Sequence, residues 1–151
     1  MMKSKWIFKG QYLEEPPPDT FGFTYRISFE EKYYIGCKSF WSTTNGKISK
    51  RRSELIYKGR GKKPGREKVT KESNWRVYNS SSAIVKQLIS EHGEDKFRFE
   101  ILDFYPSKTE LLLAEAQEII NHACDPNLLN GWLKITIYLK QMECNKNTDL
   151  K

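Results

Sequence analysis

Hydrophobic and polar residues alternate along segment 21–40 in a way that predicts two β-strands joined by a turn. In the first strand, residues 21–29, aromatic and aliphatic side chains occupy every second position and share one face, as in a half-buried strand. The charged residues 30–32 form the predicted turn, and the second strand follows at 33–38. Gly36 is a poor strand former, so we expect backbone or ligand to approach closely at this position.

Periodic patterns further along the chain predict two helices and another strand. An amphipathic helix is expected over 83–91, preceded by a serine cap, and a third strand over 96–105. The capping box Ser-Lys-Thr-Glu at 107–110 opens a helix that runs to about residue 123. The alternating stretch 133–139 is a candidate fourth strand. Together these elements predict an α+β fold, with a small antiparallel sheet of three core strands flanked by helices.

The length of 151 residues indicates one domain. We expect residues 1–20 to form an N-terminal arm, from which Trp6 can dock on the domain. The domain itself is predicted over 21–132 and includes a basic insert at 38–76, and residues 133–151 are expected to form a strand and tail.

Positive charge is concentrated in the insert 38–76, which holds 13 Lys and Arg against three Glu, a formal charge of +10. The whole chain carries +7, so the remainder sums to −3. A localised basic patch favours a polyanionic partner such as DNA, although a solvated lysine-rich loop is the alternative interpretation. The predicted DNA contacts are Lys38, Arg51, Arg60, Lys62, Lys63, Arg66 and Arg76, with Ser80 and Ser81 at a helix N-terminus.

Several protein classes do not fit the sequence. No apolar run reaches the roughly 18 to 20 residues of a spanning helix, and the N-terminus has no apolar region typical of a signal peptide. The cysteines Cys37, Cys124 and Cys144 include no CxxC pair, so neither a disulfide framework nor a zinc site is indicated. The glycine-rich loop 59–65 lacks P-loop spacing. We therefore expect a cytoplasmic protein with reduced thiols, without a membrane or small-molecule cofactor.

Two charged residues fall on the apolar faces of predicted helices. After a turn at Asn45-Gly46, residues 48–57 are helix-compatible, and a helical wheel places Arg52 within the apolar arc. On the helix that begins after residue 107, Glu115 lies within the buried arc. A buried arginine needs an anion, and a buried carboxylate needs a cation from the protein or a metal ion. A salt bridge from Glu115 to Arg52 or another basic residue is the alternative, and Arg52 could equally extend to a surface carboxylate.

These residues together resemble the GIY-YIG endonuclease family. Tyr34-Ile35-Gly36 matches the second triplet of the family motif, and Phe23-Thr24-Tyr25 stands where the family has Gly-Ile-Tyr. The segments YYIGCKSFWS and NWRVYNSSS, with the helix that bears Glu115, are similar to a group of small GIY-YIG proteins encoded by tailed phages. The resemblance covers 21–132.

The resemblance implies a metal-dependent endonuclease that acts on DNA, which we expect to be double-stranded. It assigns catalytic roles to Tyr25, Tyr34, Arg52, Glu115 and Asn130. Glu115 would bind a single Mg²⁺ or Mn²⁺, a tyrosine would orient or deprotonate the attacking water, and Arg52 would neutralise the phosphorane. A tyrosine of ordinary pKa is a poor base, so basic neighbours are needed, and Lys38 is the nearest in sequence.

Two other functions remain open at this stage. A non-catalytic nucleic-acid-binding module would use the same basic insert, with Glu115 in a salt bridge and the tyrosines serving only as cross-strand packing. A structural or host-directed accessory protein would have kept the scaffold and lost the activity. Divalent-dependent cleavage separates the enzyme from both.

Overall fold

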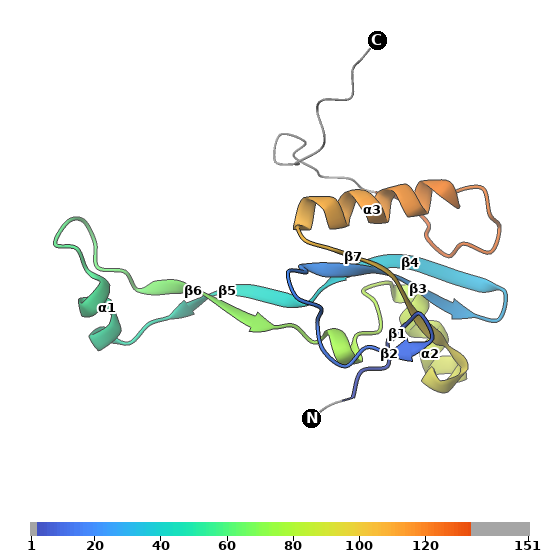
Figure 1. The fold of residues 1–151 in the computed structure, drawn as a ribbon, viewed down its shortest axis with the longest axis horizontal. Coiled ribbons are helices and arrows are strands. Elements are labelled where there is room, and N and C mark those ends of the chain that lie inside the picture. Colours follow the sequence, from blue (N-terminus) through green and yellow to red (C-terminus); the bar gives the residue numbers. More distant parts are fainter. Residues whose placement is uncertain (1–2, 134–151) are drawn as a thin grey trace, which may run out of the picture. The chain divides into compact units, whose positions relative to one another are not determined.

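The computed structural model describes residues 3–133 and divides the chain into two units (Figure 1). The ribbon unit is Trp41–Ser73, and the sheet unit comprises the residues up to Phe40 and from Asn74 onward. The predicted division into arm, domain and tail stays a prediction. The candidate fourth strand at 133–139 lies, beyond its first residue, outside the described residues.

A mixed sheet is the centre of the sheet unit, with strand order β2-β1-β7-β3-β4. Its three long strands are antiparallel neighbours: β3 (Gly22–Phe29), β4 (Lys32–Ser39) and β7 (Arg98–Tyr105). The short β1 (Ile7–Phe8) runs parallel to β7, and β2 (Gln11–Tyr12) pairs with β1. The predicted hairpin and third strand are confirmed, and β4 lies at one edge of the sheet.

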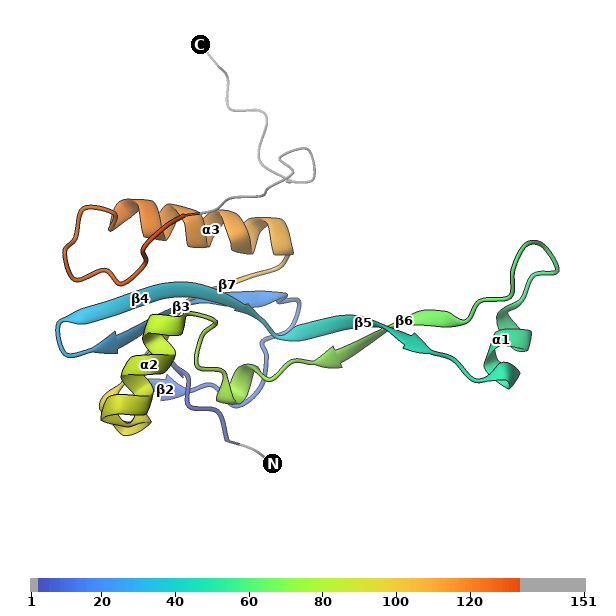
Figure 2. The ribbon, with the colours of Figure 1, turned by 180° about the vertical axis from the view of Figure 1, so that it is seen from behind.

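Helices cover both faces of this sheet, with α3 (Lys108–Asn121) on one side and α2 (Ala83–His92) on the other (Figure 2). The caps are those expected from the sequence. Ser82 Oγ accepts from the Val85 amide, and Ser107 Oγ accepts from the Glu110 amide and donates to the Glu110 carboxylate. Two short 3₁₀ helices, η1 (Trp75–Val77) and η2 (Glu94–Lys96), lie at either side of α2 in the chain. The predicted α+β class is confirmed.

The main core is aromatic and lies on the α2 side of the sheet. Trp6, Phe23, Phe40 and Trp75 are fully buried, and their rings meet at centroid distances of 5.1 to 6.2 Å. Aromatic pairs at these distances add stability beyond the area that they bury. A smaller cluster of Tyr33, Ile35 and Ile119 fills the α3 side. Both faces of β4 are therefore fixed by packing.

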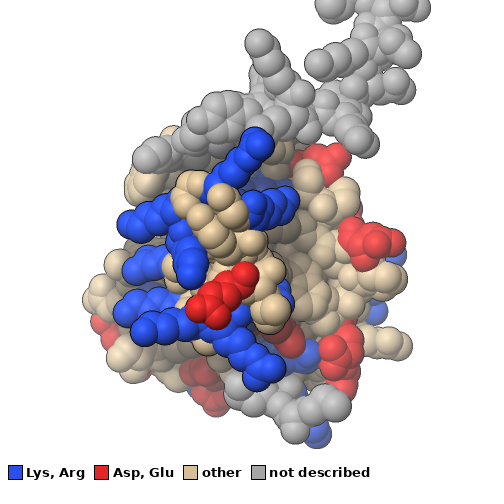
Figure 3. Space-filling view, turned by 90° about the vertical axis from the view of Figure 1, so that its left-hand side faces the viewer, with Lys and Arg blue, Asp and Glu red and all other residues tan. Residues whose placement is uncertain are grey.

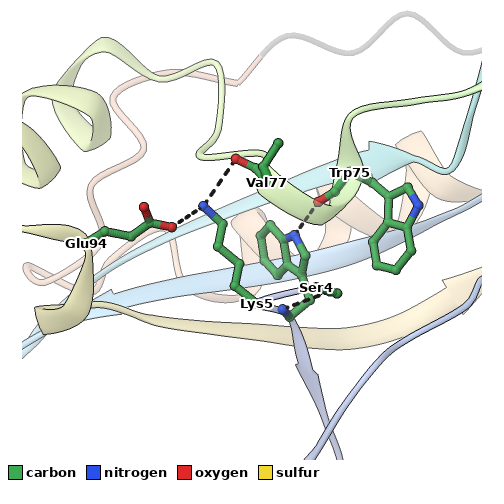
Figure 4. Close-up of polar contacts among 6 residues, drawn as sticks. Ser4, Lys5, Trp75, Val77 and Glu94 are labelled. Carbon is green, nitrogen blue, oxygen red and sulfur yellow. Dashed lines mark hydrogen bonds and ion pairs between the residues drawn. The ribbon is translucent and has the colours of Figure 1, made fainter. Parts of the chain in front are cut away.

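The N-terminal segment contributes to this core. Trp6 Nε1 donates to the Trp75 carbonyl over 2.6 Å, and Lys5 Nζ contacts the Glu94 carboxylate at 2.6 Å and the Val77 carbonyl at 3.3 Å (Figure 4). The expected docking of Trp6 is confirmed, and the segment also supplies β1 and β2. These bonds hold η1 and η2, which flank α2, to the start of the chain.

The ribbon unit has little interior of its own. Its strands β5 (Trp41–Lys47) and β6 (Arg66–Glu72) pair antiparallel, and α1 (Lys50–Ile56) lies between them in the chain. The predicted Asn45-Gly46 turn is wrong, because both residues lie inside β5 and pair with β6. A two-residue turn pattern does not reveal the non-local register that extends the strand through it. Among residues 3–133, no helix is long and apolar enough to cross a membrane.

Candidate active site

A pocket of about 610 Å³ opens at the edge strand β4 of the sheet unit. Its wall includes Tyr34 from β4, Glu115 from α3, Ser81 from the start of α2, and Asn130 and Trp132 from the segment after α3. Three of the predicted catalytic residues, Tyr34, Glu115 and Asn130, therefore share one cavity. Tyr34 and Glu115 reach it from opposite faces of the sheet, which is possible because β4 is an edge strand.

Glu115 lies on the face of α3 that packs on β4, as the helical wheel predicts. The Cys37 thiol donates to Glu115 Oε2 over 3.1 Å. Burial raises the pKa of Glu115 above its ordinary value, and the Cys37 hydrogen bond only partly offsets that effect. The carboxylate is half-buried and makes no ion pair with any Lys, Arg or His among the described residues. The salt-bridge alternative for Glu115 therefore has no support in the described part of the chain.

Cys37 is a contact that the sequence interpretation missed. It lies on the opposite face of β4 from Tyr34, because successive side chains of a strand point to opposite faces and one position is odd and the other even. Burial and the charge of Glu115 raise the pKa of its thiol. The group is therefore a neutral donor at neutral pH and orients one oxygen of the carboxylate. Strand alternation could have placed Cys37 on the face opposite Tyr34, but not shown that α3 covers that face.

Tyr25 is almost completely buried, with 1% of its surface exposed. Its hydroxyl lies over Gly36 on the neighbouring strand, so close that a Cβ at Gly36 would be 2.4 Å from the hydroxyl oxygen. The glycine of the Tyr-Ile-Gly triplet thus makes room for the tyrosine of the other strand. Burial raises the pKa of Tyr25 well above its ordinary value, so the phenol stays protonated at neutral pH.

Tyr34 is half-buried and faces the pocket. Burial and the negative charge of Glu115 raise the pKa of its hydroxyl. Its ring lies 6.4 Å from that of Tyr25, measured between centroids, and the neighbouring Ser80 side chain lowers the pKa of both tyrosines by less than burial raises it. Of the two motif tyrosines, Tyr34 is the one that lines the pocket.

Ser80 is a buried neighbour of these two tyrosines. It is 2% exposed, its φ of 79° is in the left-handed region, and its Oγ also accepts from the Ser82 amide at 3.1 Å. The geometry does not support its predicted contact with a DNA phosphate, because the hydroxyl is enclosed and accepts from the Ser82 amide. Ser81, by contrast, is exposed on the pocket wall. No local pattern distinguishes these positions within a run of three serines.

Asn130 acts on the backbone of β4. Its Oδ1 accepts from the Ile35 amide over 3.0 Å and its Nδ2 donates to the Ile35 carbonyl over 2.8 Å. The backbone of 127–129 pairs with Tyr33 in the same way. Asn130 therefore fixes the strand between Tyr34 and Gly36, and it lies in the pocket wall beside them.

Lys38 is half-buried, and its ammonium lies 4.3 Å from the centre of the Tyr78 ring. Burial lowers the pKa of Lys38. The Tyr78 ring in turn contacts that of Tyr25, at 6.1 Å between centroids. Tyr78 is a second neighbour of the tyrosine pair that the sequence interpretation missed, and its chain separation from both strands gave no signal.

Arg52 belongs to the ribbon unit, and its predicted inward orientation is wrong. No residue of α1 is buried, Leu55 on the supposed apolar face is 74% exposed, and the Arg52 side chain is 57% exposed. Its guanidinium instead pairs with Glu67 on β6 at 3.5 Å. The wheel failed because an apolar arc does not show whether anything packs against it. The catalytic role of Arg52 stays a prediction.

The ribbon unit concentrates the basic side chains. It carries 11 Lys and Arg against three Glu, a formal charge of +8, which leaves −1 for the rest of the chain. Viewed from the side on which α1 lies in Figure 1, these side chains crowd one surface (Figure 3). The exposed members include the predicted DNA contacts Arg51, Arg60, Lys62, Lys63 and Arg66.

Arg76 differs from these residues, because its guanidinium is used inside the sheet unit. It donates to the Glu14 carbonyl and pairs with the Glu15 carboxylate at 3.3 Å. Its stacking on the neighbouring Trp75 ring adds a further contact, at 4.6 Å to the centroid. Its predicted contact with DNA is therefore not supported by the geometry.

The side chains around Glu115 provide only part of the ligand set that a hard divalent cation needs. Among residues 3–133, no group of three or more His, Cys, Asp or Glu could hold a metal ion. Mg²⁺ in nucleotide and nucleic-acid enzymes commonly uses one or two carboxylates, several waters and the substrate phosphates. A single pocket carboxylate without a cation partner is compatible with that pattern. The described residues do not provide a metal site built wholly from protein ligands.

Residues 6–130 match a family model described as "Putative endonuclease segE, GIY-YIG domain". The match spans most of the chain and includes β1 and β2 as well as the hairpin, the pocket strand and Asn130. It confirms the resemblance drawn from the motif residues. No curated protein and no solved structure matches the chain.

Proposed function

The chain belongs to the GIY-YIG endonuclease domain family, and on that basis we propose that it is a metal-dependent nuclease that hydrolyses phosphodiester bonds of double-stranded DNA. One observation supports the proposal most strongly. Glu115 is a half-buried carboxylate with a raised pKa, in a pocket it shares with Tyr34, and it has no cation partner among the described residues. A carboxylate in that position is unfavourable unless a cation binds it.

In this proposal Glu115 holds Mg²⁺ or Mn²⁺. The ion, when bound, would supply charge stabilisation to the phosphoryl and leaving oxygens. The Cys37 thiol donates to Oε2 of the carboxylate, so Oε1 is the oxygen that would remain for a cation. Asn130 holds β4 in register, and this fixes Tyr34 relative to the carboxylate.

Tyr34 is the tyrosine that we assign to the attacking water. Its phenol is protonated at neutral pH because its pKa is raised, so it orients the water as a hydrogen-bond partner rather than removing a proton unaided. Tyr25 serves as a positioning residue, since its hydroxyl is enclosed between Gly36 and Ser80. The exposed cations of the ribbon unit are assigned to the DNA backbone, and the catalytic role of Arg52 stays a prediction.

Glu115→Gln tests the proposal directly. The amide keeps the size of the side chain and removes its charge, so we expect cleavage of supercoiled plasmid in Mg²⁺ or Mn²⁺ to fall about 100-fold or more. DNA affinity, measured by fluorescence anisotropy without divalent ions, should not fall.

The matched control is Glu118→Gln, one helical turn away on α3, where the carboxylate lies near His122 at 3.6 Å. It should retain cleavage. Wild-type cleavage that persists in chelator, or full cleavage by Glu115→Gln, would reject the assigned role. DNA binding without any cleavage by the wild type would favour the non-catalytic module.

A further inference from the structure

The two faces of the β5–β6 ribbon differ in the side chains that they present. Residues directly opposite in an antiparallel pair share a face. One face, which we call the Asn45 face, carries the pairs Asn45/Lys68 and Lys47/Arg66, and nearer the other end Thr43/Thr70 and Trp41/Glu72. All four side chains of the first two pairs are exposed. The part of this face that holds these two pairs is therefore a row of hydrogen-bonding side chains with a positive charge, and the acid Glu72 lies at its other end.

The Lys47/Arg66 pair is unusual for a ribbon. Like charges directly opposite each other destabilise strand pairing, and neither side chain forms an ion pair among the described residues. The unfavourable pairing is relieved when an anion binds between the two cations. The pair therefore indicates a polyanionic ligand on this face.

The opposite face has a different balance. It carries Ser42/Lys71, Thr44/Val69 and Gly46/Glu67. Its acid, Glu67, is the partner of Arg52 from α1 at 3.5 Å. Its single lysine, Lys71, and Glu67 give this face a formal charge of zero. The Asn45 face has three cations and one acid, Glu72, and so carries a formal charge of +2.

We propose that the Asn45 face of the ribbon enters the major groove of duplex DNA and reads base edges there. The major groove admits a two-stranded β-ribbon. Asn pairs with adenine edges, and Lys and Arg pair with guanine O6 and N7, so the four side chains are of the types that recognise bases. An isolated ribbon is only marginally stable in water, and docking in a groove would stabilise it. The inference rests on the proposed function for its choice of DNA as partner.

The test uses the full chain with Glu115→Gln, so that binding is measured independently of cleavage. A random-sequence duplex pool is enriched for bound DNA, and the enriched duplex becomes the probe. Lys68→Ala and Lys71→Ala each remove one exposed lysine from β6, on opposite faces. We expect Lys68→Ala to weaken binding about tenfold and Lys71→Ala to weaken it about twofold, as loss of a single peripheral charge.

A second probe isolates the groove contact. Replacing dG by 7-deaza-dG removes the N7 acceptor and leaves the phosphates unchanged. This replacement should weaken DNA binding by the Glu115→Gln parent chain. It should weaken binding by Arg66→Ala and Lys68→Ala less, because each of these variants already lacks a side chain that would contact the N7 atom. In the free protein, Lys47→Glu should not lower the melting temperature, because the new glutamate faces Arg66 across the ribbon. The same variant should bind duplex DNA with lower affinity.

Three results would overturn the proposal: no sequence is enriched from the pool, the two lysine variants weaken binding equally, or 7-deaza-dG has no effect. Each would leave binding to the phosphate backbone as the only role of the ribbon. Failure of cleavage by the wild type would instead reject the nuclease assignment while leaving these binding results intact, so the two hypotheses fail separately.

Discussion

The sheet unit and the ribbon unit differ in the burial of their side chains and in their formal charge. Trp6, Phe23, Phe40 and Trp75 are fully buried in the sheet unit, whereas no residue of α1 is buried and nearly every residue of β5 is exposed. The formal charge divides in the same way, with +8 in the ribbon unit and −1 elsewhere. The unit with the aromatic core carries the pocket residues, and the unit without one carries the cations.

This difference follows from what each task requires. A reacting centre needs side chains held by packing and by second hydrogen bonds, as Ser80 and Asn130 provide in the sheet unit. A surface that contacts a polyanion needs exposed charge, which is incompatible with close packing of the same residues. The comparison therefore predicts that equivalent substitutions in the two units have unequal effects.

Gly36→Ala should have the largest effect on stability. Its Cβ would lie 2.4 Å from the Tyr25 hydroxyl, so the core must shift, and we expect the free energy of unfolding to fall by about 1 to 3 kcal/mol. Denaturant unfolding followed by tryptophan fluorescence measures this change. Gly65→Ala in the ribbon unit is the control, because nothing lies within 4 Å of the Cβ that this substitution adds. Equal losses for the two variants would remove the contrast between the units.

Charge removal should affect binding in the reverse order. Arg60→Ala with Lys62→Ala in the ribbon unit should weaken duplex binding about tenfold and reduce the slope of log affinity against log salt by about 2. The control removes two exposed lysines from helices of the sheet unit, Lys86→Ala with Lys108→Ala. A salt slope that changes equally in both double variants would show that the positive patch is not the binding surface.

The smallest expected effect is a gain in stability from Glu115→Gln. The folded-state pKa of Glu115 is raised above its unfolded value, so the folded protein binds the proton more tightly and its stability falls as pH rises through that range. Removing the charge should therefore raise the melting temperature at neutral pH by about 1 to 4 °C. This gain in melting temperature should disappear as the pH is lowered to about 4.

Thermal unfolding measured across this pH range checks the sign. Glu118→Gln again serves as the control and should show no gain at neutral pH. A melting temperature that falls for Glu115→Gln at neutral pH would mean that the carboxylate is already compensated in the folded protein. In that case the main observation behind the proposed metal role would be lost.

Local patterns predicted much of the sheet unit. The alternation in 21–38 predicted β3 and β4, and the capping box predicted the start of α3. The orientation of Glu115 also followed from the sequence, because α3 has a continuous apolar face and a sheet to cover. These features depend on period and on contacts between residues close in sequence.

The features that were missed depend on distant contacts. The pairing of β5 with β6 and that of β1 with β7 bring together residues with no shared local signal. Arg52 was misjudged because α1 has an apolar arc but no surface against it. The roles of Ser80 and Cys37 required knowledge of which strand faces which helix.

The backbone contacts of Asn130 have a consequence for solubility. The free edge of a sheet can pair with strands of other molecules and so initiate aggregation. On β4 this edge is occupied by 127–130, through the backbone beside Tyr33 and the side-chain amide at Ile35. At the far edge, β2 is only two residues long, which also limits pairing. The strand that carries Tyr34 is thus shielded from neighbouring molecules by the same asparagine that sets its register.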